Sequence, residues 1–592
     1  MVPRKHSFSS HEYETKGFLF FNLTFYEYGY NFNLEVFVVE KLIEITVGSL
    51  LDDMANRYPD HECALYTDRP FRKTYSEFNE LCNKVAKSFL KMGIKKGDHI
   101  AIWATNVPEW LITLFASAKI GAVLVTVNTN YKIFELEYLL KQSDTNTLVM
   151  IDGFKDSNYI QILNELCPDL KNSEPGNFHN ENLPFLKNII SVSTEKHPGM
   201  FNWDDIIDFG CDISDEELYA LSKTLDCHDV INMQYTSGTT GFPKGVMLTH
   251  YNIINNGMCI GDCMHFTHED RLCIPVPFFH CFGLVLAIMA CVTHGTTMVP
   301  VDYYSPLKVM KAIQSERCTA VHGVPTMYIA MLEHADFDKY DFSSLRTGIM
   351  SGSPCPIKVM EAVVEKMNMK DITIPYGQTE ASPVCTQTRI GDSLELRVST
   401  VGRALPFIEC KIVDPETNQD LPDGVPGEFV ARGYNVMKGY YKMPEATAQA
   451  IDADGWLHTG DLATRDENGY YKITGRIKDM IIRGGENIYP KEIEEFLYTV
   501  PEIKDVQVIG VPSKVYGEEI MACVILKEGC NLTEEQVKAA VKANMARHKT
   551  PKYVGFMDSF PMTASGKIQK YKMREKAIAQ LGLEDEAAIE TA

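Results

Sequence analysis

The sequence has few cysteines for its length and no excess of positive charge. Its 592 residues include 16 cysteines and no Cys-x-x-Cys pair, which excludes a disulfide scaffold and predicts reduced thiols in a cytoplasmic protein. The 57 lysines and arginines are outnumbered by 79 aspartates and glutamates, so the formal net charge is -22. Because nucleic-acid binding depends on clustered lysine and arginine, this balance argues against a nucleic-acid partner. It remains compatible with a local site for a small anion.

Long apolar runs are also missing. The longest, Gly283 to Val292, falls well short of the ~18 residues of a membrane span, so we expect no transmembrane segment and interpret this run as a buried core helix. Residues 1–44 are an atypical extension, rich in aromatics but without the small-residue cleavage site of a signal peptide. Three interpretations stay open: a strand-forming segment, a membrane-surface contact, or upstream sequence before a true start near Glu40. The last, or a loosely attached tail, is favoured.

One cluster of metal-ligating residue types is present. Cys259, Cys263, His265 and His268 fall within ten residues, and such crowding can ligate zinc. The stretch nevertheless has the pattern of one helix and its exit. We therefore interpret the cluster as structural.

Apolar strands alternate with helices from residue 45 to about residue 390. The pattern predicts, for example, a strand at His99–Trp103 followed by a helix at Glu109–Ile120, and therefore an α/β fold with parallel sheets covered on both faces. Hairpins are predicted at Val413–Gly433 and Gly455–Gly475, where Asp-Gly and Asn-Gly turns separate β-rich runs. A smaller α+β unit follows Asp479. We thus predict a large N-terminal domain at residues 45–478 and a small C-terminal domain at 479–592.

The sharpest motif is YTSGTTGFPKG at residues 235–245. Its glycines allow backbone N–H groups to approach an anion, its hydroxyls donate hydrogen bonds and Lys244 adds positive charge. It is not a Walker loop, because Gly245 follows the lysine and the glycine spacing differs. The segment therefore predicts a phosphate-binding loop of another kind.

Further motifs offer groups suited to a nucleotide. Tyr376, Thr379 and Glu380 lie in one pentapeptide after a predicted strand, where the ring can stack on a purine, the hydroxyl can contact a phosphate and the carboxylate can bind Mg²⁺. Asp461 can accept hydrogen bonds from a ribose diol, and Arg476 presents a fork for phosphate or ribose oxygens. Taken singly, Asp461 could equally be a turn cap and Arg476 a surface ion pair.

As an ordered set, these motifs resemble the adenylate-forming superfamily of acyl-CoA synthetases, luciferase-like enzymes and peptide-synthetase adenylation domains. The resemblance covers about residues 45–578 and includes the glycine-bearing loop Arg483–Pro490 and the lysine-bearing segment Pro561–Ile568. Segments Pro277–Gly283 and Ser351–Pro354 are most similar to the fatty acyl-CoA ligase branch. The resemblance implies a β-rich subdomain within the large domain and a mobile C-terminal domain. It also implies that ATP and an acid form an acyl-adenylate and pyrophosphate, after which CoA displaces AMP.

The resemblance implies roles for single residues. The β- and γ-phosphates would be held by Thr236, Ser237, Gly238, Thr239, Thr240 and Lys244. The adenine and α-phosphate would be contacted by Gly352, Ser353, Tyr376, Gln378 and Thr379, the ribose by Asp461 and Arg476, and Mg²⁺ by Glu380 and Thr236. The second half-reaction would use a hinge at Lys478 and a CoA-facing loop of Gly484, Gly485 and Glu486. Lys567 would bridge the acyl carboxylate and the α-phosphate, and would be catalytic together with Glu380 and Thr379.

The acyl group is less well determined. The aromatic segment of Phe279 and His280, together with Val324, is expected to form the wall of an apolar pocket, and His322, Met327 and Tyr328 are expected to face it. A medium- to long-chain fatty acid is favoured. The alternatives are an aromatic-acid CoA ligase, an acyl-adenylate ligase that loads a carrier protein, and a catalytically silent lipid-binding protein. Expected partners are the acid, ATP and CoA; a peripheral membrane contact and a homodimer stay open.

Overall fold

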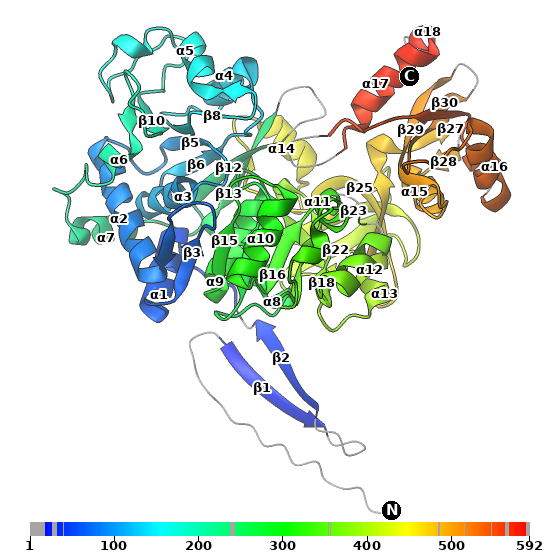
Figure 1. Ribbon diagram of the computed structural model, residues 1–592, viewed down its shortest axis with the longest axis horizontal. Coiled ribbons are helices and arrows are strands. Elements are labelled where there is room, and N and C mark those ends of the chain that lie inside the picture. The colour runs from blue at the N-terminus through cyan, green and yellow to red at the C-terminus, as the bar shows by residue number, and fades with distance from the viewer. Residues whose placement is uncertain are drawn as a thin grey trace, which may run out of the picture.

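The computed structural model confirms the predicted α/β architecture (Figure 1). It describes residues 18–25, 32–39, 41–236, 243–352, 355, 357–483, 486–513, 516–545, 547–562 and 568–587. It describes only the backbone of residues 18–25, 32–39, 478, 482, 486, 487, 547 and 587.

Two large sheets form the centre of the described chain. In the first, the strands are parallel from β11 to β12 and antiparallel at β13 and β24. Its order is β11 (Phe201–Asn202), β10 (Asn188–Val192), β7 (Thr147–Ile151), β5 (His99–Trp103), β6 (Val123–Thr126), β12 (Val230–Thr236), β13 (Lys244–Thr249), β24 (Gly439–Tyr440). In the second, the strands are parallel except β4. Its order is β18 (Asp371–Thr373), β17 (Thr347–Met350), β16 (Ala320–Gly323), β14 (Arg271–Ile274), β15 (Thr297–Pro300), β3 (Glu62–Leu65), β4 (Arg72–Thr74).

One hydrophobic core joins both sheets and the helices packed against them. Its helices include α1 (Val47–Arg57), α2 (Tyr75–Lys91), α3 (Pro108–Ile120) and α8 (His250–Cys263). The apolar run at 283–292 is helical and buried as predicted, but Phe282–Met289 is a π-helix that continues into α9 (Ala290–His294). The outer helices are α4 (Ile133–Gln142), α5 (Tyr159–Leu166), α7 (Asp215–Ser222), α10 (Pro306–Glu316), α11 (Pro325–Leu332), α12 (Ile357–Lys366) and α14 (Pro444–Ala450).

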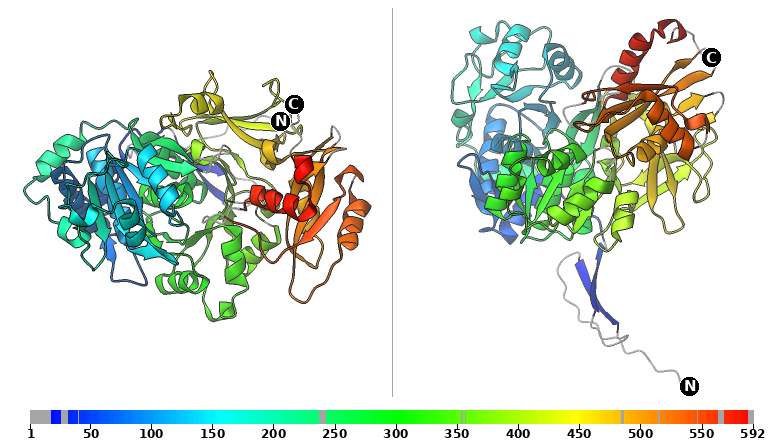
Figure 2. Two further views of the ribbon diagram at one scale, coloured as in Figure 1. Left: turned by 90° about the horizontal axis from the view of Figure 1, so that it is seen from above. Right: turned by 45° about the vertical axis from the view of Figure 1, so that its right-hand side comes forward.

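The C-terminal third is richer in antiparallel strands, as predicted. The hairpin predicted at Gly455–Gly475 is confirmed as β25 (Leu457–Arg465) with β26 (Tyr471–Arg476). The hairpin predicted at Val413–Gly433 has other bounds, because β22 (Ile408–Val413) ends where the prediction begins and pairs with β23 (Gly427–Gly433) across a long connection. The last sheet combines β28 (Glu486–Ile488), β27 (Ile481–Arg483), β30 (Gly517–Leu526), β29 (Ile503–Ser513) and β31 (Tyr553–Phe556) with α15 (Pro490–Leu497), α16 (Glu534–Asn544) and α17 (Lys570–Leu581). Figure 2 shows this orange-to-red unit at one side of the molecule.

The N-terminal extension contains an antiparallel hairpin of β1 (Phe18–Phe25) and β2 (Phe32–Val39). It projects from the body of the molecule in Figure 1 and in the right-hand view of Figure 2. Across the described ranges, no helix is both long enough and apolar enough to cross a bilayer.

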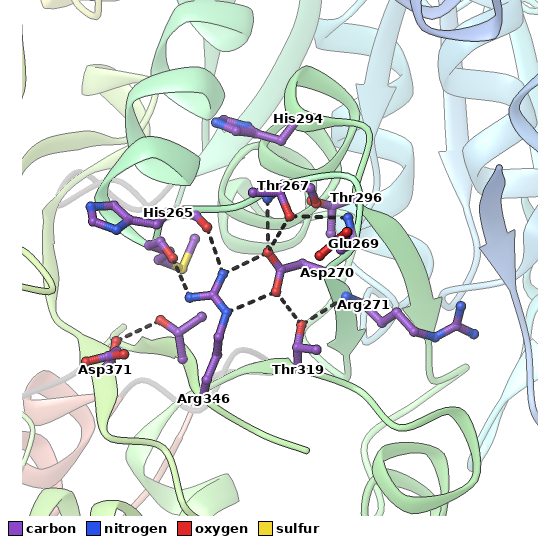
Figure 3. Close-up of polar contacts among 12 residues, drawn as sticks. His265, Thr267, Glu269, Asp270, Arg271, His294, Thr296, Thr319, Arg346 and Asp371 are labelled. Atoms are coloured by element: carbon purple, nitrogen blue, oxygen red, sulfur yellow. Dashed lines mark hydrogen bonds and ion pairs between the residues drawn. The ribbon is translucent and has the colours of Figure 1, made fainter. Parts of the chain in front are cut away.

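A buried carboxylate fastens the N-terminal ends of the second sheet together (Figure 3). Asp270 is 4% exposed and lies directly before β14. Its carboxylate accepts hydrogen bonds from Nε and Nη2 of Arg346 at 3.0 and 2.7 Å. The hydroxyl of Thr319 donates to the same carboxylate at 2.7 Å, as does the backbone N–H of Thr267 at 3.0 Å. Because Thr319 and Arg346 immediately precede β16 and β17, this network fixes where these strands begin.

We predict that Arg346→Ala lowers the free energy of unfolding by about 3 kcal/mol, because Asp270 would stay buried without its cation. Chemical denaturation measures this change. The matched control is Arg432→Ala, which removes an arginine from an exposed pair with Glu409 at 2.9 Å and should cost less than ~1 kcal/mol. Equal losses in the two variants would contradict the assigned role of the network.

Candidate functional site

The phosphate-loop motif connects two paired strands. Thr236 ends β12 and Lys244 begins β13, and the two residues face each other in the antiparallel register. The structure thus places the two ends of the motif side by side. Ser237, Gly238, Thr239 and Thr240 lie outside the described residues.

Lys244 and Glu380 meet at one tyrosine that the sequence analysis missed. Tyr440, on β24, pairs across the sheet with Val246 of β13. The Lys244 ammonium lies 4.7 Å from the centroid of the Tyr440 ring, while the Tyr440 hydroxyl donates to Oε1 of Glu380 at 2.8 Å. Burial and the nearby Glu380 carboxylate raise the pKa of Tyr440 well above its usual value. A two-residue strand carries too little pattern to predict this contact from sequence.

Glu380 itself lies in a short 3-10 turn, Thr379–Ala381. The carbonyl of Glu380 accepts the N–H of Met437 at 2.9 Å, which ties this turn to the segment before β24. Thr379 is 9% exposed and interacts with the buried thiol of Cys281, whose pKa is raised by burial and by Glu380. The pentapeptide and the segment Pro277–Gly283 are therefore neighbours.

Tyr376, Asp461 and Arg476 form a second polar group. The Tyr376 hydroxyl donates to Oδ2 of Asp461 at 2.9 Å, and Arg476 Nε lies 3.0 Å from Oδ1. Asp461 and Arg476 are cross-strand partners on β25 and β26. Asp461 is only 7% exposed, so its two partners hold a nearly buried carboxylate that still has lone pairs for further donors. Burial raises the pKa of Tyr376, so its hydroxyl stays protonated and can donate.

Gly352 and Val324 touch at the ends of β17 and β16. Gly352 has a φ of +88°, and a Cβ there would lie 3.0 Å from Cγ1 of Val324. A residue expected beside adenine therefore adjoins one expected in the acyl pocket. Gln378 precedes the turn that holds Glu380 and is half-buried. Ser353 lies outside the described residues.

The aromatic segment divides into buried and accessible residues. Phe278 and Phe282 are 1% and 6% exposed, whereas Phe279 and His280 are half-buried, and Nδ1 of His280 accepts the N–H of Phe282 at 3.1 Å. Tyr328 corrects an expectation. It is fully buried and donates to the carbonyls of Val321 and Ile349, so it packs in the core and does not face the pocket.

Asn106 fixes the backbone of the aromatic segment, and the sequence analysis missed it. Its amide donates to the carbonyls of Val276 and Val301 at 3.0 and 3.1 Å, while Oδ1 accepts the N–H of Phe278 at 2.8 Å. The side chain is 3% exposed and joins the end of β5 to the loops after β14 and β15. An asparagine just before a helix resembles an ordinary N-terminal helix cap, so the sequence alone gives no signal that Asn106 has this role.

The remaining expected residues belong to the CoA-facing loop, the hinge and the lysine-bearing segment. Gly484, Gly485 and Lys567 lie outside the described residues, and Glu486 and Lys478 are described by backbone alone. Lys478 lies in a 3-10 turn, Ile477–Asp479, between β26 and β27.

The cysteine and histidine cluster does not form a ligand set. Within the described ranges, the metal-ligating atoms that converge within 4.8 Å belong instead to Asp226, Cys227 and His228. Cys259 and Cys263 are buried in α8, which ends at Cys263. All sixteen cysteines are free thiols.

Comparisons with known proteins agree with this geometry. The family model described as AMP-binding enzyme matches residues 51–441, and that described as AMP-binding enzyme C-terminal domain matches residues 492–567. "Putative acyl-CoA synthetase YngI" of Bacillus subtilis is 57% identical over 92% of this chain and 99% of its own length. "Medium-chain acyl-CoA ligase ACSF2, mitochondrial" of Danio rerio is 44% identical over 91% and 89% of the two chains.

Solved structures share the whole architecture. The anthranilate CoA ligase AuaEII in complex with anthranoyl-AMP matches with a TM-score of 0.79 and 25% identity, over 92% of this chain and 99% of that one. ATP-bound MatB from Rhodopseudomonas palustris matches with a TM-score of 0.74 and 27% identity, over 89% and 98%.

His322, which was also expected to face the acyl pocket, gives the stability of the fold a pH dependence. It is fully buried, its Nε2 lies 3.0 Å from the carbonyl of Leu286, and burial lowers its pKa to about 4. Because the unfolded pKa is about 6.5, the stabilising contribution of the neutral imidazole is complete above pH 6.5 and is lost as pH falls toward 4. We predict that the stability gap between wild type and His322→Gln narrows by about 3 kcal/mol over this range. Denaturant unfolding at pH 7 and pH 4 measures the gap; a constant gap would contradict the prediction.

Proposed function

Since the chain belongs to the AMP-binding enzyme family, we propose that it is an ATP-dependent acyl-CoA ligase acting on a medium- to long-chain fatty acid. The observation that carries the proposal is the convergence of separate motifs: Lys244, Tyr440 and Glu380 form one group, and Tyr376, Asp461 and Arg476 another. This grouping of cation, acid and aromatic side chains supports a nucleotide site. The relatives named as acyl-CoA ligases support the same activity.

The proposed chemistry needs positive charge more than a base. A fatty acid, with a pKa near ~4, is already an anion at neutral pH and can attack the α-phosphate without a proton acceptor. Repulsion between this carboxylate and the triphosphate is the main obstacle, and fixed cations stabilise the charge at the transferring centre. In the proposal Lys244 neutralises the β- and γ-phosphates, together with Thr236, Ser237, Gly238, Thr239 and Thr240, and Lys567 bridges the two reacting anions.

The residues present fit a magnesium ion. Glu380 supplies a carboxylate and Thr236 a hydroxyl, which are hard oxygen donors, and Mg²⁺ commonly takes one or two carboxylates along with substrate phosphates. The ion would supply charge neutralisation for the phosphates. Asp461, oriented by Tyr376 and Arg476, would hold the ribose, with the adenine beside Tyr376, Gly352 and Ser353.

The acyl pocket is proposed at Phe279 and His280, the accessible part of the aromatic segment, together with Val324 beside Gly352. A medium chain is supported by the relatives named as medium-chain ligases. Aromatic acids form the second candidate, because a solved anthranilate CoA ligase shares the architecture. An apolar pocket discriminates by only about 1–3 kcal/mol per methylene, so the exact chain length needs measurement.

The C-terminal domain is proposed to move about Lys478, with residues 45–478 and 479–592 as the two bodies. One orientation would present Lys567 for adenylation, and the other would present Gly484, Gly485 and Glu486 to CoA. The free cysteines favour a reducing compartment, and we propose the cytoplasm.

Acid-dependent pyrophosphate release tests the proposed function. Purified protein with ATP and Mg²⁺ is given hexanoate to hexadecanoate, benzoate and anthranilate in turn, and then either CoA or a carrier protein as acceptor. We expect release to be greatest with an aliphatic acid of medium length and thioester to form on CoA. If no acid supports pyrophosphate release, the silent lipid-binding alternative is favoured. Product on the carrier protein alone would favour the other ligase.

We predict that Lys567→Ala lowers adenylation by roughly 10²–10³-fold, because a cation at the reacting centre is lost. Thioester formation from supplied acyl-adenylate and CoA should survive. A bulky side chain at Gly484 should instead slow thioester formation and leave adenylation intact. Rapid-quench assays measure each half-reaction separately. If Lys567→Ala weakened both halves equally, the two-orientation proposal would be wrong.

A further inference from the structure

The backbone around Tyr440 is fixed on both sides. Within β24 its N–H donates to Oγ1 of Thr447 at 2.9 Å, and the N–H of Tyr441 donates to the carbonyl of Gly245 at 2.8 Å. A Cβ at Gly439 would lie 2.9 Å from Cγ2 of Thr447, so α14 packs closely against this strand. Because the backbone is held by the phosphate-loop strand β13, the Tyr440 side chain has a defined position relative to Lys244.

The ring and the hydroxyl of Tyr440 serve two opposite charges. The ring face attracts the Lys244 ammonium at 4.7 Å, and the hydroxyl donates to Glu380 at 2.8 Å. Tyr440 is only 8% exposed, so both contacts are shielded from solvent. Among the described residues, no ion pair joins Lys244 directly to Glu380. A direct pair would neutralise both charges and turn them away from a bound nucleotide.

We propose that Tyr440 is a positioning residue that separates Lys244 from Glu380 and aims both at the metal–triphosphate. This inference rests on the proposed function and adds a residue to that site. The hydroxyl orients the Glu380 carboxylate for the metal, and the ring keeps the ammonium available for phosphate oxygens. Removal of the hydroxyl should therefore weaken metal binding, and removal of the ring should also weaken nucleotide binding.

Three variants separate these effects. Tyr440→Phe keeps the ring and loses the hydroxyl, whereas Tyr440→Leu loses both. Tyr441→Phe is the matched control, because the Tyr441 hydroxyl donates to Asp144 at 2.9 Å and its ring lies 5.3 Å from the ammonium of Lys442, outside the site. Free Mn²⁺ is measured by electron paramagnetic resonance during titration with a non-hydrolysable ATP analogue and no acid. Melting temperature and the KM values for Mg²⁺ and ATP are measured in parallel.

We expect Tyr440→Phe to weaken Mn²⁺ binding about tenfold with little change in metal-free nucleotide affinity, the scale of one hydrogen bond to a charged group. Tyr440→Leu should lose nucleotide affinity as well, and Tyr441→Phe should match wild type. Wild-type Mn²⁺ binding by Tyr440→Phe would overturn the proposal, whether or not its melting temperature falls. Because these titrations contain no acid, they decide the role of Tyr440 even if no acid supports pyrophosphate release.

Discussion

The charge of Asp270 is the constraint on which the site depends most. Burying a carboxylate to this degree is costly unless its partners are in place. Arg346, Thr319 and the backbone N–H of Thr267 must therefore all donate hydrogen bonds to it. These residues stand at the starts of parallel strands that end beside the candidate site. Once the starts are aligned, strand length alone determines where Val324, Gly352 and the aromatic segment emerge. The network therefore acts on the site from the opposite edge of the sheet.

At the site itself, each carboxylate accepts a hydrogen bond from a tyrosine and lies near a cation. Asp461 is contacted by a tyrosine and an arginine. Glu380 is contacted by a tyrosine whose ring face also lies against a lysine ammonium. In both groups a phenol with a raised pKa donates to the carboxylate and remains neutral. The arrangement leaves lone pairs on the acids for a ligand, which fits a site built for a highly charged substrate.

Much of the fold could be predicted from the sequence, because it rests on local pattern. The strand His99–Trp103 has the predicted bounds, and the hairpin of β25 and β26 turns at its Asn-Gly dipeptide as predicted. The motif residues Tyr376, Asp461 and Arg476 could be named, but their mutual contacts could not, because they depend on register between distant strands. Tyr440 escaped prediction because its two-residue strand carries little pattern, and Asn106 because it resembles an ordinary helix cap. The π-helix at Phe282–Met289 escaped because its apolar run has the same residue pattern as a buried α-helix. Tyr328 was misplaced because an aromatic residue near a pocket motif does not reveal which side of its helix is core.

The contact between Gly352 and Val324 links two properties that are often treated as separate. A larger residue at position 324, introduced to shorten the acyl cavity, would press on a glycine turn whose φ suits almost no other residue. In the proposed site, where Val324 lines the acyl pocket and Gly352 adjoins the adenine, substrate range and nucleotide binding would therefore be coupled at this contact. In the proposed site, diversification toward new acids at this contact would then require paired substitutions after β16 and β17.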